Sequence, residues 1–216
     1  MKNKIGYKYI CVEGNIGAGK TTLCEKLSQE YNCKLILEEF AENPFLKYFY
    51  ADPERYSLTV ELFFLAERQK QLQKEIIHKD MFTDFVLADY TLIKSLLFAK
   101  NNLNPEEFKL YQNIFQALSQ GIPRPDLLIY LHRPIENVLS NIQKRGRPYE
   151  LNIEFEYLEN IQNMYFEFFR TQTLIPVLIV DAENMDFLQN PTHYNEIKNL
   201  FTREFTPGVH HIRILF

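Results

Sequence analysis

The stretch Gly14-Asn15-Ile16-Gly17-Ala18-Gly19-Lys20-Thr21-Thr22 decides the fold, because it contains the pattern G-x-x-x-x-G-K-[ST]. An apolar run at residues 7–13 predicts a short buried strand before it, and a helical pattern at 20–31 follows it. Glycines let such a loop take backbone angles that a Cβ would obstruct, so that its N–H groups can wrap a phosphate. Lys20 suits the β and γ phosphates of a nucleotide, and the Thr21 hydroxyl suits Mg²⁺. Residues 14–22 are therefore predicted to form a phosphate-binding loop.

Outside this loop, short apolar runs alternate with longer helical patterns. The apolar runs lie at residues 34–37, 82–88, 126–131 and 176–180, and the helical patterns lie at 54–78, 91–100, 105–120, 135–144 and 154–173. This alternation indicates an α/β fold in three layers, with a five-stranded parallel sheet covered by helices on both faces. Because no linker or repeat interrupts the sequence, we expect residues 1–216 to form a single domain.

Composition and charge argue against several classes of function. The net charge is −4 and no run of five or more Lys and Arg occurs, so we expect no nucleic-acid partner. No uncharged run of about 18 apolar residues occurs and the first residues do not resemble a signal peptide, so we expect no membrane association. The cysteines Cys11, Cys24 and Cys33 are odd in number and indicate reduced thiols. We therefore expect a cytoplasmic protein.

A phosphate-binding loop alone does not separate GTPases, ATPase motors and small-molecule kinases. A GTPase needs a guanine-reading N-K-x-D motif, and the sequence contains none. A motor usually has an apolar strand that ends in an Asp for Mg²⁺, whereas the apolar run at 126–131 begins with its Asp. Both observations favour a small-molecule kinase.

Four segments in order resemble the deoxynucleoside kinases, the family of deoxycytidine, deoxyadenosine and deoxyguanosine kinases. They are residues 14–23, Asp52-Pro53-Glu54-Arg55-Tyr56, Phe98-Ala99 and Arg145-Gly146-Arg147, and the resemblance covers about residues 7–187. It implies a P-loop kinase fold with an arginine-containing lid at about 141–150. It also implies transfer of the γ-phosphoryl group of ATP to the 5′-hydroxyl of a deoxynucleoside, with Mg²⁺ as cofactor, by an enzyme that is often a homodimer. The apolar residues of the helix at 92–103 are a candidate interface.

By this resemblance, Glu38 matches the carboxylate that takes the proton from the 5′-hydroxyl. A carboxylate just outside the carboxyl end of a parallel strand faces the phosphate crevice, which agrees with that role. Glu39 is adjacent and remains an alternative base. Tyr50 and Glu150 resemble the donor and acceptor that hold the sugar 3′-hydroxyl, although packing among aromatic neighbours also explains Tyr50.

The same resemblance assigns residues to the lid, to the base pocket and to the ATP side. Arg145 and Arg147 match catalytic lid arginines, because guanidinium groups stay charged and bind two phosphate oxygens at once. Glu61 and Arg68 are seven residues apart on one helix face and match positions that read the base edge. Two further assignments complete the set: an aromatic wall at Phe98, for which core packing is an equal explanation, and an adenine-side loop that starts at Asp181.

Three positions depart from the family pattern. The first is Asp89-Tyr90-Thr91, where the family usually has an acidic residue followed by Arg and Ser; Asp89 can still bind substrate and Mg²⁺, and Lys94 is a candidate replacement for the arginine. The second is Asn141, which stands where the first lid arginine falls. The third is Glu61 in place of a glutamine, which when ionised only accepts hydrogen bonds. Glu61 favours a purine deoxynucleoside, either deoxyguanosine or deoxyadenosine.

Two other functions remain open at this point. A nucleoside-monophosphate kinase, such as a thymidylate kinase, would need a cation for the phosphate of its substrate, and Arg68 is available for that purpose. A non-catalytic nucleotide-binding regulator is the other alternative, because the expected arginine is missing at Tyr90.

Overall fold

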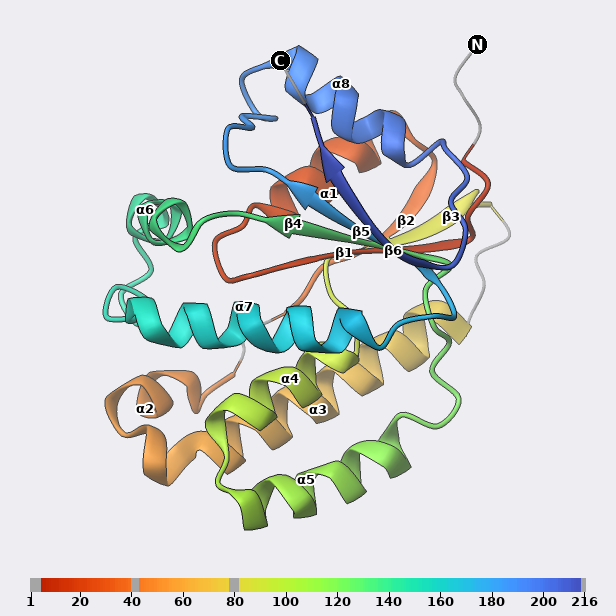
Figure 1. Ribbon diagram of the computed structural model, residues 1–216. Coiled ribbons are helices and arrows are strands. Elements are labelled where there is room, and N and C mark those ends of the chain that lie inside the picture. The colour runs from red at the N-terminus through yellow and green to blue at the C-terminus, as the bar shows by residue number, and fades with distance from the viewer. Residues whose placement is uncertain (1–4, 40–42, 78–81, 215–216) are drawn as a thin grey trace.

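A parallel six-stranded sheet forms the middle layer of the computed structural model, which describes residues 5–39, 43–77 and 82–214. The strand order is β2-β3-β1-β4-β5-β6 and every described pair is parallel (Figure 1). The strands are β1 (Tyr9–Gly14), β2 (Cys33–Ile36), β3 (Phe85–Ala88), β4 (Leu127–His132), β5 (Pro176–Asp181) and β6 (Gly208–Arg213). The three-layer α/β fold expected from the sequence is confirmed.

The strand order places the phosphate-binding loop at the centre of the sheet. β1 lies between β3 and β4, and all six of its residues are buried. From β1 the chain runs to β2 at one edge of the sheet, returns to β3 beside β1, and then crosses to the other side at β4. Ligands of such sheets bind where the order reverses, outside the carboxyl ends of the strands. That point is the segment after Gly14.

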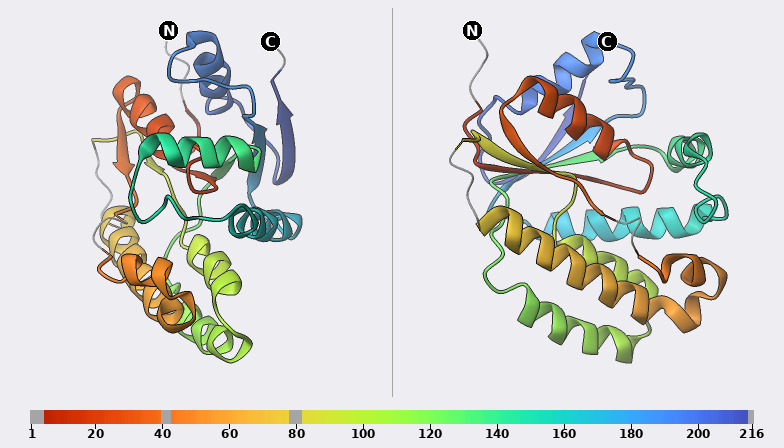
Figure 2. Two further views of the ribbon diagram at one scale, coloured as in Figure 1. Left: turned by 90° about the vertical axis from the view of Figure 1, so that its left-hand side faces the viewer. Right: turned by 180° about the vertical axis from the view of Figure 1, so that it is seen from behind.

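Helices cover both faces of the sheet (Figures 1 and 2). On one face lie α1 (Lys20–Glu30) and α8 (Pro191–Leu200), whose Leu23, Leu27 and Ile197 pack onto β1, β4 and β5. On the other face lie α3 (Pro53–Ile77), α4 (Ile93–Asn102) and α7 (Phe155–Arg170), with α2 (Leu46–Ala51) and α5 (Pro105–Leu118) farther out. α6 (Ile135–Arg145) lies beyond the carboxyl ends of the strands, next to the β1–α1 loop.

Local sequence signals explain several element boundaries. Asn104 accepts a hydrogen bond from the N–H of Glu107, whose side chain reaches back to the Asn104 N–H, so a capping box with Pro105 at the first turn begins α5. Gly146 ends α6 in the left-handed region, at φ +68°. The chain can therefore turn sharply between the two arginines that flank this glycine.

The structure corrects some of the sequence expectations. The sheet has six strands rather than five, because the C-terminal segment adds β6 at an edge. α2 and α8 were not predicted. Of the apolar residues of the helix expected at 92–103, Leu92, Leu97 and Leu103 are buried within the chain, whereas Ile93 and Leu96 are partly exposed. Of the helix expected at 54–78, His78 lies outside the described residues.

Within the described ranges, no helix is both long enough and apolar enough to cross a bilayer.

Candidate active site

The phosphate-binding loop is shaped by close backbone approaches that only glycine permits. Gly17 has φ +80°, and a Cβ there would lie 2.9 Å from the carbonyl oxygen of Val138 on α6. The Lys20 ammonium is buried and donates to the carbonyl oxygens of Gly14 and Asn15, each at 2.9 Å. Asn15 in turn donates to Leu158 O on α7, at 2.8 Å. The loop is thus fixed between α6 and α7 before it turns into α1.

Two oxygen ligands suitable for Mg²⁺ meet at the start of α1. Thr21 Oγ1 donates to Asp89 Oδ2 at 2.5 Å, and Asp89 Oδ1 accepts from the Glu38 N–H at 2.8 Å. Burial raises the pKa of the Asp89 carboxyl, and a bound cation would relieve that cost. Among the described residues, no group of three or more His, Cys, Asp and Glu side chains is arranged so that it could hold a metal ion by itself. Thr21 and Asp89 fit Mg²⁺, which is often bound by one or two protein groups together with phosphate oxygens and water.

Glu38 follows β2 and is held between two cations. Arg68 donates to Glu38 Oε1 from Nε at 2.8 Å and from Nη2 at 2.6 Å, and Lys94 donates to Oε2 at 2.5 Å. Burial alone would raise the pKa of the Glu38 carboxyl, but Lys94 and Arg68 lower it well below its ordinary range. Glu39, by contrast, is exposed and accepts from Gln71 Nε2. The geometry therefore favours Glu38 over Glu39 as the carboxylate that faces the phosphates.

The middle residue of the Asp89-Tyr90-Thr91 segment is an uncharged tyrosine, where the family usually has an arginine. The Tyr90 ring is buried, and its hydroxyl donates to Gln71 Oε1 at 2.5 Å. Lys94 brings its ammonium from the next turn of chain to Glu38 instead. This contact supports the expectation that Lys94 supplies the charge that the family arginine would bring.

One pocket brings together all the residues that the sequence assigned to the acceptor. Its lining includes Glu38, Tyr50, Glu61, Arg68, Asp89, Phe98 and Glu150, together with Ile16, Gly17, Lys20, Thr21, Arg145 and Arg147. These residues come from the loop after β1, the start of α1, the ends of β2 and β3, the helices α2, α3, α4 and α6, and the segment before α7. Residues scattered over more than a hundred positions thus surround one cavity.

The inner end of this pocket carries a buried carboxylate. Glu61 is 2% exposed, and its Oε1 accepts from Asn102 Nδ2 at 2.7 Å. Its Oε2 has no hydrogen-bond partner in the part of the chain that the structure describes. Burial raises the pKa of Glu61 to about 7, against the opposing effects of Arg68 and Asn102. Sequence reasoning missed Asn102 and Tyr157, although Asn102 lies one helical turn after Phe98 and so shares its face.

Tyr50 and Glu150, the residues assigned to the sugar 3′-hydroxyl, both contact residues of the lid. Tyr50 stacks on Tyr149, with ring centroids 6.2 Å apart and planes 18° apart. Glu150 is buried and pairs with both lid arginines: Arg145 Nη2 donates to its Oε2, and Arg147 Nη1 lies 3.3 Å from its Oε1. The same carboxylate therefore lines the acceptor pocket and anchors the two lid arginines.

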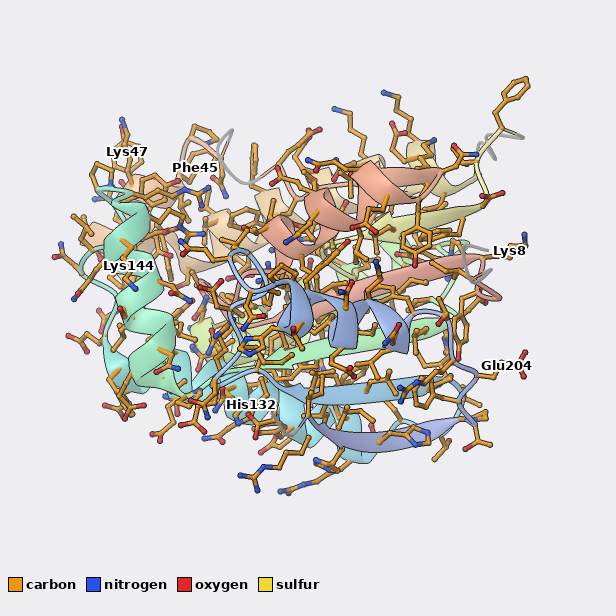
Figure 3. All side chains as sticks on the ribbon, turned by 90° about the horizontal axis from the view of Figure 1, so that it is seen from above. Lys8, Phe45, Lys47, His132, Lys144 and Glu204 are labelled. Atoms are coloured by element: carbon orange, nitrogen blue, oxygen red, sulfur yellow. The ribbon has the colours of Figure 1, made fainter. Side chains whose placement is uncertain are left out.

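A second pocket lies on the other side of the loop. It is lined by Gly17, Ala18, Gly19, Lys20, Thr21, Thr22, Arg133, Asn141, Lys144, Arg145, Arg147 and residues 185–189. Lys144 lies at the same end of the molecule as Phe45 and Lys47 (Figure 3). Asn141 donates to Gly17 O at 2.9 Å, so it fixes the loop. Gly17, Lys20, Thr21, Arg145 and Arg147 line both pockets, which marks their junction.

Residues 185–189, which follow β5, line this second pocket, but Asp181 at the end of β5 does not. Asp181 Oδ1 accepts from the Glu183 N–H, and Asp181 lines neither pocket. The Phe187 ring packs against Gly19, where a Cβ would lie 2.9 Å from its Cζ. Arg133, which the sequence analysis missed, donates to Ala18 O at 3.1 Å and to Met185 O at 2.8 Å. Its position just after β4 was the available signal.

Comparisons with known proteins agree with this arrangement. The Deoxynucleoside kinase family model matches residues 10–206. Deoxyguanosine kinase of Bacillus subtilis (strain 168) is 36% identical over 193 residues, which cover 88% of this chain and 93% of that protein. Deoxyadenosine/deoxycytidine kinase of the same organism is 35% identical over 196 residues, covering 88% of each chain. The solved deoxyadenosine kinase from M. mycoides with bound dATP superposes with a TM-score of 0.75 at 27% identity, over 90% of this chain and 98% of that one.

These matches confirm the resemblance seen in the sequence segments. The chain belongs to the deoxynucleoside kinase family, whose members are ATP-dependent phosphotransferases.

Proposed function

We propose that this protein transfers the γ-phosphoryl group of ATP to the 5′-hydroxyl of a purine deoxynucleoside. The observation that carries the proposal is the junction of the two pockets at Lys20, Thr21 and the lid arginines, with Glu38 at the edge of the acceptor pocket. ATP would occupy the pocket lined by residues 17–22 and 185–189, and the nucleoside would occupy the pocket that reaches Glu61.

Each residue at the junction has a role that follows from its charge. Glu38 is held ionised, so it can orient the 5′-hydroxyl and accept its proton. Lys20, Arg145 and Arg147 would neutralise charge on the equatorial oxygens of the transferred group. Thr21 and Asp89 would hold Mg²⁺, which supplies charge neutralisation at the β and γ phosphates.

The purine preference is supported by the buried Glu61 carboxylate. Its unpartnered Oε2 and its lack of a donor when ionised suit a base edge that presents N–H groups, as guanine N1 and N2 do. The exocyclic amine of adenine also presents a donor, as does that of cytosine. The name of one Bacillus subtilis relative, deoxyguanosine kinase, points in the same direction, and the name of the other, deoxyadenosine/deoxycytidine kinase, includes one purine and one pyrimidine nucleoside.

A substrate panel tests this proposal. We expect ATP-dependent formation of 5′-monophosphates from deoxyguanosine and deoxyadenosine with kcat/KM values above those for deoxycytidine and thymidine. Phosphorylation of nucleoside monophosphates but not nucleosides would establish the alternative kinase class, although Arg68 is already engaged by Glu38 and Ser95. ATP binding without activity on any acceptor would establish a regulator. A pyrimidine as the fastest substrate would refute the purine assignment alone.

We further infer a cytoplasmic homodimer. The three cysteines are free, and Cys11 and Cys24 are buried, which suits a reducing compartment. The dimer rests on the family resemblance, and sedimentation velocity across a range of protein concentrations tests it. A single species with a mass near 25.8 kDa at all concentrations would rule the dimer out.

A further inference from the structure

Two side chains from adjacent helices meet at the inner end of the acceptor pocket. Glu61 comes from α3 and Asn102 is the last residue of α4, and both line the pocket. Asn102 Nδ2 lies 2.7 Å from Glu61 Oε1 and 3.3 Å from the Tyr157 hydroxyl. Because Glu61 Oε2 is buried and has no partner among the described residues, the carboxylate keeps one oxygen for a ligand.

The orientation of the Asn102 amide is fixed by its own neighbours. Its Oδ1 accepts from Asn101 Nδ2 at 2.9 Å, which leaves the amide N–H groups for Glu61 and Tyr157. A flipped amide would place Oδ1 against the Glu61 carboxylate, where two acceptors face each other. Asn102 is therefore held as a donor to Glu61.

The protonation state of Glu61 decides which purine edge it matches. An ionised carboxylate only accepts hydrogen bonds, so it matches the N1–H and N2–H₂ donors of guanine. A protonated carboxyl offers one donor and one acceptor, so it matches the N1 acceptor and N6–H₂ donor of adenine. The Glu61 side chain can therefore match either purine, depending on its charge. A neighbouring residue that favours the ionised form favours guanine, and one that favours the protonated form favours adenine.

We propose that Asn102 is a specificity-determining positioning residue, which by donating to Glu61 Oε1 orients that carboxylate and favours its ionised form, and so favours deoxyguanosine over deoxyadenosine. This inference rests on the proposed function and deepens it. Asn102 acts through Glu61, because its amide N–H bonds are taken up by Glu61 and Tyr157.

The charges around Glu61 make its protonation state sensitive to the loss of the Asn102 donor. Burial raises the pKa of Glu61 to about 7, so neither form dominates strongly near neutral pH. Arg68, the Asn102 donor and Lys94 lower the pKa, while Glu38 raises it. The groups that face Glu61 come from several neighbouring elements: Tyr50 from α2, Arg68 from α3, Lys94 and Asn102 from α4, Glu38 after β2, Tyr111 from α5 and Tyr157 from α7. Loss of the Asn102 donor should raise the pKa and populate the protonated form at pH 7.

The direction of the pH effect follows from this scheme. Below the pKa of Glu61 the protonated form prevails and adenine is favoured; above it the ionised form prevails and guanine is favoured. The ratio of kcat/KM for deoxyguanosine to kcat/KM for deoxyadenosine should therefore rise with pH across 7. Titration of Lys20 or Glu38, and any loss of active enzyme, affects both substrates equally and cancels in the ratio.

The test measures this ratio at pH 6, 7 and 8 for the wild type, Asn102→Ala and Asn113→Ala. Asn113 is exposed on α5 and lines none of the pockets described, so Asn113→Ala is a matched control. For the wild type we expect the ratio to rise about tenfold per pH unit, roughly a hundredfold from pH 6 to pH 8, because the proportion of ionised to protonated Glu61 changes by that factor. Asn102→Ala should lower the ratio at pH 7 about tenfold and move the rise to higher pH, and the control should match the wild type.

A second variant keeps the inference testable if Asn102→Ala does not fold. Glu61→Gln cannot ionise and offers a donor and an acceptor, so its ratio should not change with pH and should favour deoxyadenosine. A ratio that is independent of pH in the wild type, or an equal loss for both substrates in Asn102→Ala, would overturn the role of Asn102 while leaving the kinase activity in place. Failure of the proposed function would appear differently, as no phosphorylation of either purine deoxynucleoside.

Discussion

Lys94 Nζ lies 2.5 Å from Glu38 Oε2, which places a buried ammonium from α4 against the carboxylate that follows β2. Arg68 binds the other oxygen of the same carboxylate. Lys94 is a neighbour of Lys20 as well, and its charge contributes to lowering the pKa of Lys20. A single lysine therefore connects the carboxylate assigned to proton transfer with the lysine assigned to the phosphates.

We predict that Lys94→Ala lowers kcat about a hundredfold, because it removes a cation beside the transferred phosphoryl group. Glu38 would keep its pairing with Arg68, so the fold should survive. Lys100→Ala is the matched control, since Lys100 lies on the same helix and pairs with Glu167 at the surface. Steady-state kinetics check this, and an unchanged kcat in Lys94→Ala would remove Lys94 from the phosphoryl-transfer site.

The link between Glu150 and the lid arginines leads to a prediction about the sugar. If Glu150 accepts from the 3′-hydroxyl, the wild type should prefer a 2′-deoxynucleoside over its 2′,3′-dideoxy analogue by about tenfold or more. Glu150→Ala should remove most of that preference, whereas Glu159→Ala, at an exposed position on α7, should keep it. Competition assays with both nucleosides measure the preference. A preference retained in Glu150→Ala would assign the 3′-hydroxyl to another group.

Removal of a lid arginine should affect the chemical step. We expect Arg145→Ala to lower kcat roughly a hundredfold to a thousandfold, with a smaller change in the KM for the nucleoside. The reason is that a guanidinium that lines both pockets neutralises charge mainly in the transition state. Single-turnover rates measure this directly. A change in KM alone would show that Arg145 contributes only to binding.

The environment of Lys20 predicts a pH limit for ATP binding. Burial, together with the charge of Lys94, lowers the pKa of Lys20 to about 8. The ammonium is therefore present below pH 8 and is lost as the pH rises above it, so kcat/KM for ATP should fall about tenfold per pH unit in that range. At saturating ATP the fall should shift to higher pH, because bound phosphates favour the charged form. A kcat/KM for ATP that stays constant up to pH 9.5 would contradict this prediction.

Removal of a hydrogen bond to the buried Glu13 should lower the stability of the fold rather than the kinase activity. Its Oε1 accepts from the N–H and hydroxyl of Thr91, and its Oε2 accepts from the Tyr165 hydroxyl at 2.8 Å. Tyr165→Phe leaves a buried carboxylate oxygen unpaired and should cost about 1–3 kcal/mol of unfolding free energy. Tyr48→Phe at an exposed position is the control and should cost little. Urea denaturation measures both, and equal stabilities of the two variants would contradict the role of Glu13.

The sequence predicted the parts of the fold whose signals are local and strong. Buried parallel strands are continuous apolar runs, so β1, β3, β4 and β5 were evident. β6 was missed because it is a partly exposed edge strand that contains His210, His211 and Arg213. An edge strand with polar residues lacks the continuous apolar run that identifies a central strand.

The candidate site was predictable where residues lie in motifs, and not where tertiary packing places them. Lys20 and Thr21 belong to a pattern with fixed spacing, and the structure places them at the junction of the two pockets. Asn102 and Arg133 belong to no such pattern; they reach the site because their helix or strand ends there. The ion pairs of Glu38 with Arg68 and Lys94 likewise depend on packing between distant segments, which spacing along the chain does not encode.

The most direct test of the account compares Glu38→Gln with Glu39→Gln in the formation of deoxynucleoside 5′-monophosphate from ATP. Both variants replace one carboxylate by an amide, but Glu38 is partly buried and paired with Arg68 and Lys94, whereas Glu39 is exposed. We predict that Glu38→Gln lowers kcat at least about a hundredfold and that Glu39→Gln remains close to the wild type. Near-full activity in Glu38→Gln, or the larger loss in Glu39→Gln, would contradict the assignment of Glu38 as the group that accepts the proton of the 5′-hydroxyl.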